Sequence, residues 1–94
     1  MGILKLYTII TRDNCGWCVK AKTLLKQNNL TFDEISIPNR LTREEFHVLV
    51  EKYNTTKTVP KIFKGKVLIG GYEELEDLIL QQQREKANHG EGGL

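Results

Sequence analysis

Both cysteines of this 94-residue chain fall within four positions, Cys15-Gly16-Trp17-Cys18. Two thiols at this spacing can form and break one disulfide between them, which is the chemistry of thiol–disulfide exchange. One possible bridge is too few for a small secreted scaffold that depends on several disulfides. Two cysteines also cannot supply a four-thiolate zinc site. The pair is therefore the strongest chemical signal in the sequence.

The first cysteine lies where a helix is expected to begin. Asp13 and Asn14 are N-cap residue types, and apolar residues follow at helical spacing as far as Leu25. Free N–H groups and the helix dipole stabilise a thiolate in the first turn, so we expect the pKa of Cys15 to lie below the usual value of about 8.5. Cys18 lies one turn further on and belongs to the apolar stripe. The pattern thus predicts Cys15 as the nucleophile and Cys18 as the buried resolving thiol.

The cysteine pair has two other interpretations, a zinc site and a pair of inert core residues. Zinc binding would need two more ligands, and the two histidines, His47 and His89, are too far apart for a zinc-finger spacing. Free cysteines can also be inert core residues, because a thiol packs as a small hydrophobic group. The position at a helix start favours redox chemistry over both. His47 is expected on a helix flank with no chemical role.

The elements around the pair follow from hydrophobic spacing and from turn residues. We expect strands at 3–10, 31–37, 62–63 and 67–69, a helix between 15 and 28, a helix capped by Thr42, and a last helix after Gly71. A right-handed crossover makes the first two strands parallel, and the hairpin at Gly65 adds two antiparallel strands. The prediction is an α/β fold of order β-α-β-α-β-β-α, with a four-stranded mixed sheet and helices on both faces.

Composition limits the classes of function that remain. The chain has 39% hydrophobic and 28% charged residues, typical of one globular domain, which we place at 1–87 with an irregular Gly-rich tail at 88–94. Fourteen Lys+Arg and twelve Asp+Glu leave a net charge of +2, so the charge predicts no nucleic-acid or membrane partner. The N-terminal segment resembles neither a secretory signal nor a membrane span. We therefore expect a cytoplasmic protein, in which a C-x-x-C pair is catalytic or metal-binding.

Along residues 3–83 the sequence resembles the glutaredoxins, which have a thioredoxin-like fold. The resemblance rests on five features in the right order: a strand ending in Tyr7-Thr8, Arg12 three positions before the cysteine pair, the aromatic Trp17 within it, the Thr58-Val59-Pro60 segment, and Ile69-Gly70-Gly71-Tyr72-Glu73-Glu74-Leu75. Two features differ from the commonest family pattern. The pair encloses Gly16-Trp17 where Pro-Tyr is usual, and the acidic pair is Glu73-Glu74 where Asp-Asp or Ser-Asp is usual.

The resemblance implies a glutathione site around the cysteines. Pro60 would follow a cis peptide bond, and the backbone of Thr58 and Val59 would pair with the extended tripeptide. The residues implied in the remaining contacts are Arg12 and Lys57 for the glycyl carboxylate, Trp17 for packing against the tripeptide, and Gly71, Tyr72 and Glu73 for the γ-glutamyl end.

The function implied is that of a dithiol glutaredoxin, a monomer that uses glutathione as co-substrate to reduce protein disulfides and glutathione mixed disulfides. Family members supply electrons to enzymes such as ribonucleotide reductase. No metal is expected. Two alternatives stay open: a thioredoxin-like electron donor reduced by a flavoprotein reductase, and a carrier in which two chains hold a [2Fe–2S] cluster through Cys15 and bound glutathione.

Overall fold

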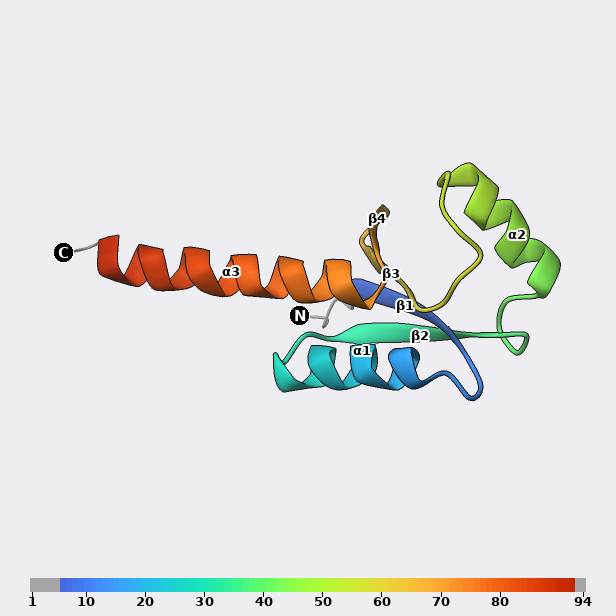
Figure 1. The fold of residues 1–94 in the computed structure, drawn as a ribbon, viewed down its shortest axis with the longest axis horizontal. Helices are drawn as coiled ribbons and strands as arrows, with labels where there is room; N and C mark the ends of the chain where they lie inside the picture. Colours follow the sequence, from blue (N-terminus) through green and yellow to red (C-terminus); the bar gives the residue numbers. More distant parts are fainter. Residues whose placement is uncertain (1–5, 93–94) are drawn as a thin grey trace, which may run out of the picture.

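The computed structural model describes residues 6–92, with side chains described up to residue 84 (Figure 1). Seven elements follow one another: β1 (Tyr7–Arg12), α1 (Gly16–Gln27), β2 (Phe32–Ile37), α2 (Arg43–Lys52), β3 (Lys61–Lys64), β4 (Val67–Gly70) and α3 (Tyr72–Gly92). This is the predicted order. Part of the first predicted strand, residues 3–5, lies outside the described residues.

The four strands form one mixed sheet in the order β2-β1-β3-β4. Strand β1 pairs in parallel with β2 and antiparallel with β3, and β3 pairs antiparallel with β4. The β3–β4 turn contains Gly65 at φ +63°, a left-handed conformation that glycine adopts at little cost. The predicted parallel crossover and antiparallel hairpin are therefore confirmed.

Each face of the sheet has its own core. Side chains from β1 and β3 pack with α1 and α3 on one face, in a cluster of Tyr7, Ile9, Ala21, Leu25, Ile62, Leu75 and Ile79. On the other face α2 contributes to a cluster of Ile10, Ile37, Phe46, Val50 and Phe63. Neighbours on a strand point to opposite faces, which is why Ile9 and Ile10 belong to different clusters. The helices cover both faces, as predicted.

The ends of α2 and α3 show how local sequence sets helix bounds. Thr42 caps α2 in the predicted capping box, in which its side chain accepts from the Glu45 N–H and Glu45 accepts from the Thr42 N–H. Helix α3 continues to Gly92 and extends past the sheet (Figure 1), whereas the sequence predicted an irregular tail from residue 88. No proline interrupts this stretch, so the helical hydrogen-bonding pattern can propagate.

Within the described part of the chain, no helix is long and apolar enough to cross a membrane.

We expect the core between α1 and α3 to contribute strongly to the free energy of unfolding. Leu25 is fully buried, so Leu25→Ala removes apolar contacts and leaves a cavity; we expect a loss of about 2–5 kcal/mol in the free energy of unfolding. Urea denaturation measures the change. Val67→Ala is the matched control, because that side chain is 68% exposed and its truncation should change stability by about 0.5 kcal/mol or less. Equal losses in both variants would contradict this assignment of the core.

Candidate active site

Cys15 is itself the N-cap of α1, one position earlier in the helix than the sequence predicted. Asn14 was expected as a cap, but it adopts φ +58° and turns the chain between β1 and α1. The side chain of Cys15 instead takes the cap role: its Sγ accepts a hydrogen bond from the Cys18 N–H at 3.1 Å. The sulfur therefore contacts one of the N–H groups that a helix start leaves without a backbone partner. Such a donor favours the thiolate over the thiol in the reduced protein.

The structure holds the two cysteines as a disulfide, with 5.2 Å between their Cα atoms. Their accessibility differs strongly. Cys18, on the buried side of α1, is 2% exposed, as predicted, whereas Cys15 is half-buried. An incoming thiol or disulfide can therefore reach Cys15 but not Cys18. This asymmetry is what the predicted division into nucleophile and resolving thiol requires.

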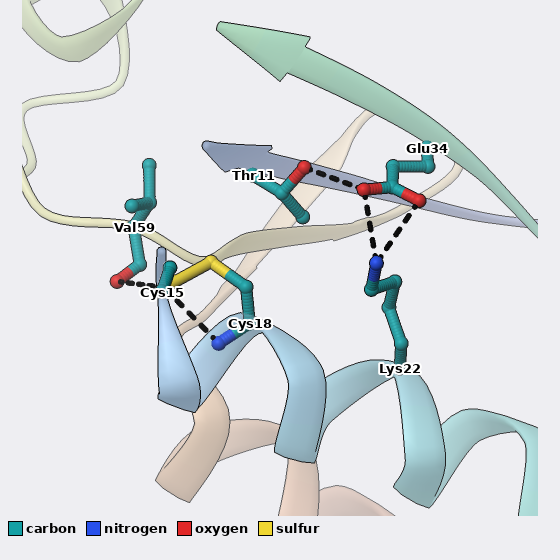
Figure 2. The surroundings of a disulfide bond; sticks show 6 residues. All are labelled: Thr11, Cys15, Cys18, Lys22, Glu34 and Val59. Carbon is teal, nitrogen blue, oxygen red and sulfur yellow. Dashed lines mark hydrogen bonds and ion pairs between the residues drawn. A yellow bond between two sulfur atoms is a disulfide. The ribbon is translucent and has the colours of Figure 1, made fainter. Parts of the chain in front are cut away.

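The segment before β3 lies against the first cysteine. The Val59–Pro60 peptide bond is cis, as the family resemblance implied, and the Val59 carbonyl oxygen lies 3.9 Å from Cys15 Sγ (Figure 2). A second cis bond, Ile37–Pro38, was not predicted. The backbone of Val59 thus borders the reactive sulfur directly.

A groove of about 220 Å³ opens beside this contact. Its lining comprises Trp17, Thr58, Val59, Pro60, Gly71, Tyr72, Glu73 and Glu74. The Trp17 and Tyr72 rings form one wall, with centroids 5.5 Å apart. Every residue that the sequence predicted for the packing, backbone-pairing and γ-glutamyl contacts lines this groove, although those residues come from three separate segments. We call it the tripeptide groove, after the ligand that the family resemblance implied.

The two predicted cations lie elsewhere. Arg12 and Lys57 do not line the tripeptide groove but a separate cleft of about 500 Å³, which shares only Val59 with it. Arg43 and His47, from the first turns of α2, line the same cleft. Sequence analysis gave Arg43 no role and expected none for His47. We call this the cationic cleft.

The acidic pair at the start of α3 has divided roles. Glu74 turns back onto its own helix start, where its Oε1 accepts the Gly71 N–H at 2.8 Å. Gly70 has φ +134°, and a Cβ there would come within 2.8 Å of Glu74 Cγ, so this glycine is explained by local packing. Gly71 has only ordinary contact distances around it. Glu73 remains exposed on the groove.

A buried lysine supports the loop that carries Val59. Lys61 is 3% exposed, and its Nζ donates to the hydroxyl oxygens of Thr56 and Thr58 at 3.0 and 3.2 Å. Burial lowers the pKa of Lys61 by disfavouring the ammonium, and the charge of Glu74 partly offsets this. Sequence analysis missed Lys61, because it precedes the strand predicted at 62–63 and a lysine there would ordinarily be assigned to solvent.

A polar cluster lies between α1 and β2, close to the disulfide (Figure 2). The buried Thr11 hydroxyl donates to Glu34 Oε2 at 2.7 Å, and Lys22 Nζ forms a salt bridge with Glu34 at 3.2 Å. The pKa of Glu34 is lowered: the Thr11 hydrogen bond is the largest cause, desolvation opposes it, and Lys22 adds to the lowering. Thr11, Lys22 and Glu34 line a third hollow, also of about 500 Å³, which both cysteines line as well. Sequence analysis missed this cluster, since only tertiary packing joins its members.

The described residues contain no group of three or more His, Cys, Asp or Glu side chains placed to hold a metal ion.

A family model, curated proteins and solved structures are similar to this chain. The glutaredoxin family model matches residues 6–69. Glutaredoxin 1 of Rickettsia felis is 36% identical over 90 residues, which are 96% of this chain and 87% of that protein, and glutaredoxin 1 of Rickettsia conorii is 39% identical over 85 residues, 90% and 82% of the two chains. The crystal structure of glutaredoxin 1 from Francisella tularensis complexed with cacodylate aligns with a TM-score of 0.67 at 35% identity, over 80% of this chain and 95% of that one.

The polar cluster predicts an acid-dependent loss of stability. Because the pKa of Glu34 is lower in the folded than in the unfolded chain, its carboxylate stabilises the fold above the ordinary pKa of 4.5, and this contribution is lost as pH falls through the folded-state pKa. The Glu34 side chain is 37% exposed, so water screens the interaction and we expect about 1 kcal/mol or less. Between about pH 6 and about pH 3, wild type should therefore lose more unfolding free energy than Glu34→Gln.

Denaturant titrations at several pH values measure this difference. Glu44→Gln, at an exposed position on α2, is the control and should follow the wild-type pH dependence. Parallel pH profiles for wild type and Glu34→Gln would show that the cluster makes no net contribution.

Proposed function

The chain belongs to the glutaredoxin family, and we propose that it is a dithiol glutaredoxin, a thiol–disulfide oxidoreductase that takes its electrons from glutathione. One observation carries the proposal. The accessible sulfur at the start of α1 lies 3.9 Å from the Val59 carbonyl oxygen, and Val59 is shared by an aromatic-walled groove and a cationic cleft. A small peptide with a central cysteine and a charged end would place its sulfur at Cys15.

The chemistry follows from the unequal positions of the two thiols. In the reduced protein the Cys15 thiolate attacks the glutathione sulfur of a mixed disulfide, a Cys15–glutathione disulfide forms, and the substrate leaves as a thiolate that takes up a proton from water. A second glutathione thiolate then attacks that glutathione sulfur, which releases glutathione disulfide and regenerates the Cys15 thiolate. With a protein disulfide as substrate, the Cys15 thiolate attacks one of its sulfurs, a Cys15–substrate disulfide forms, and the other substrate sulfur leaves as a thiolate that takes up a proton. Cys18 then loses its proton and attacks Cys15 Sγ, which closes the internal disulfide and releases the reduced protein.

The groove and the cleft support glutathione as the reductant. An extended peptide can pair with the backbone of Val59, as strands pair at a sheet edge. Arg12 and Lys57 offer charge for the glycyl carboxylate on the cleft side. On the groove side α3 begins at Tyr72, and the first N–H groups of a helix suit a carboxylate, while the exposed Glu73 suits the γ-glutamyl ammonium.

We also propose a monomer that works in a reducing cytoplasm on disulfide-containing proteins. Ribonucleotide reductase is a candidate acceptor through the family resemblance alone.

Two serine variants test the assignment of the cysteines. We expect Cys15→Ser to abolish turnover of a glutathione mixed disulfide, because the attacking sulfur is gone. Cys18→Ser should retain this turnover, because a second glutathione can resolve the Cys15–glutathione intermediate, yet it should lose most reduction of protein disulfides. The measurement is NADPH consumption coupled through glutathione reductase.

Three results would separate this proposal from its alternatives. Equal loss of mixed-disulfide turnover in both variants would refute the division of roles. Turnover with a flavoprotein thioredoxin reductase but none with glutathione would favour the thioredoxin-like donor. A brown dimer with visible absorbance after anaerobic reconstitution with iron and sulfide would favour the [2Fe–2S] carrier.

The buried lysine provides a further prediction about glutathione binding. Lys61→Met removes the two hydrogen bonds that hold Thr56 and Thr58, so the loop carrying Val59 should lose its fixed position. We expect KM for the glutathione mixed disulfide to rise roughly threefold to tenfold, about what one or two lost hydrogen bonds predict, with a smaller change in kcat. Lys66→Met, at an exposed hairpin position, should leave both constants unchanged. A fall in kcat with constant KM would show that Lys61 does not act through binding.

A further inference from the structure

The two hollows that meet at Val59 carry opposite charge. The cationic cleft is lined by three permanent cations, Arg12, Arg43 and Lys57, and by one acid, Asp13. Arg12, Arg43 and Lys57 come from three different segments, the end of β1, the start of α2 and the loop before β3, and all three are exposed. His47 also lines the cleft.

The tripeptide groove has the reverse character. Glu73 and Glu74 line it, and the described lining residues include no Lys or Arg. Lys20 lies over the Trp17 ring, 4.6 Å from its centroid, but does not line the groove. Glu74 Oε1 accepts the Gly71 N–H at the start of α3. The charged side chains that line the groove are therefore both acidic.

The cationic cleft has more cationic side chains than one glycyl carboxylate requires. Arg12 and Lys57 suffice for one carboxylate, whereas Arg43 extends the positive lining onto α2, in a cleft of about 500 Å³. The two hollows share Val59, whose carbonyl oxygen lies 3.9 Å from Cys15 Sγ. Hollows of opposite charge next to a reactive sulfur select partners by complementary charge, mainly through the rate of association and through rejection of wrong partners.

We propose that this site selects protein disulfides whose attacked cysteine is preceded by basic residues and followed by acidic ones. The proposal rests on the proposed function, because the orientation comes from glutathione: its glycyl end, C-terminal to its cysteine, faces the cationic cleft. A protein segment paired with Val59 in the same direction places its following residues toward Arg12, Lys57 and Arg43. Its preceding residues then lie toward Glu73 and Glu74.

The covalent step is that of the dithiol route. The Cys15 thiolate attacks one sulfur of the substrate disulfide, a Cys15–substrate disulfide forms, and the other substrate sulfur leaves as a thiolate that takes up a proton. Cys18 then loses its proton, attacks Cys15 Sγ and releases the bound segment as a thiol. Two electrons pass from the protein dithiol to the substrate, and two glutathione molecules restore the dithiol.

Two peptide disulfides of identical composition test the proposal. Each is a symmetric disulfide dimer of a seven-residue peptide with a central cysteine. The matched peptide has two lysines before the cysteine and two glutamates after it, and the reversed peptide has the charges exchanged. We expect kcat/KM for the matched disulfide to exceed that for the reversed one roughly tenfold at low salt, in the glutathione reductase-coupled assay. The ratio should approach one at about 1 M salt, where the screening length falls to about 3 Å.

A charge reversal within the cleft checks the origin of the preference. Arg43→Glu should reduce the matched-to-reversed ratio roughly threefold or more. Lys66→Glu makes the same change in net charge at an exposed hairpin position that lines neither hollow, and should leave the ratio as in wild type.

Equal rates for the two peptides, or an equal effect of the two charge reversals, would overturn this inference. Turnover of the mixed disulfide of glutathione and 2-mercaptoethanol by wild type is measured in parallel. If that turnover is present while the peptides react equally, only the substrate preference is refuted. If glutathione turnover is absent, the proposed function itself fails.

Discussion

The pairing of β1 with β3 is the constraint on which the site depends. Ile10, near the end of β1, pairs with Lys61 at the start of β3. The chain leaving β1 and the chain entering β3 therefore lie at the same edge of the sheet. Cys15 belongs to the first segment and Val59 to the second, so strand pairing alone brings together residues 44 positions apart. The contact between the α1 start and the loop before β3 is a consequence of where these two segments meet.

The helix start then gives the two thiols different environments. A sulfur at an N-cap can accept a backbone N–H that no carbonyl satisfies, so Cys15 combines accessibility with a stabilising donor. Cys18, one turn later, faces the sheet and is buried. Partly buried polar contacts hold the surrounding residues: Lys61 ties the Val59 loop to β3, and Thr11, Glu34 and Lys22 join β1, β2 and α1. Each of these contacts crosses between elements, so the site is fixed by the whole sheet.

Local signals made most of the fold predictable. Hydrophobic spacing, the capping box at Thr42 and the glycine turn gave the order of elements, the parallel crossover and the hairpin. Prediction was weaker where several residues could serve one local purpose. Each of the three residues from Asp13 to Cys15 can cap a helix. In the structure Cys15 is the cap, because Asn14 adopts the left-handed turn that precedes the helix. At the other end, no strong stop signal marked the limit of α3.

The amino-acid sequence by itself determined the chemistry: two thiols one helical turn apart, their order along the chain, and the family to which their context belongs. It could not determine which charges share a hollow, because Arg12, Arg43 and Lys57 come from separate segments that only the folded chain joins. The same holds for Lys61, whose burial depends on the loop folded over it, and for the separation of the cationic cleft from the tripeptide groove. Spacing along a helix is a local property, whereas burial and electric field are sums over neighbours that only the tertiary structure supplies.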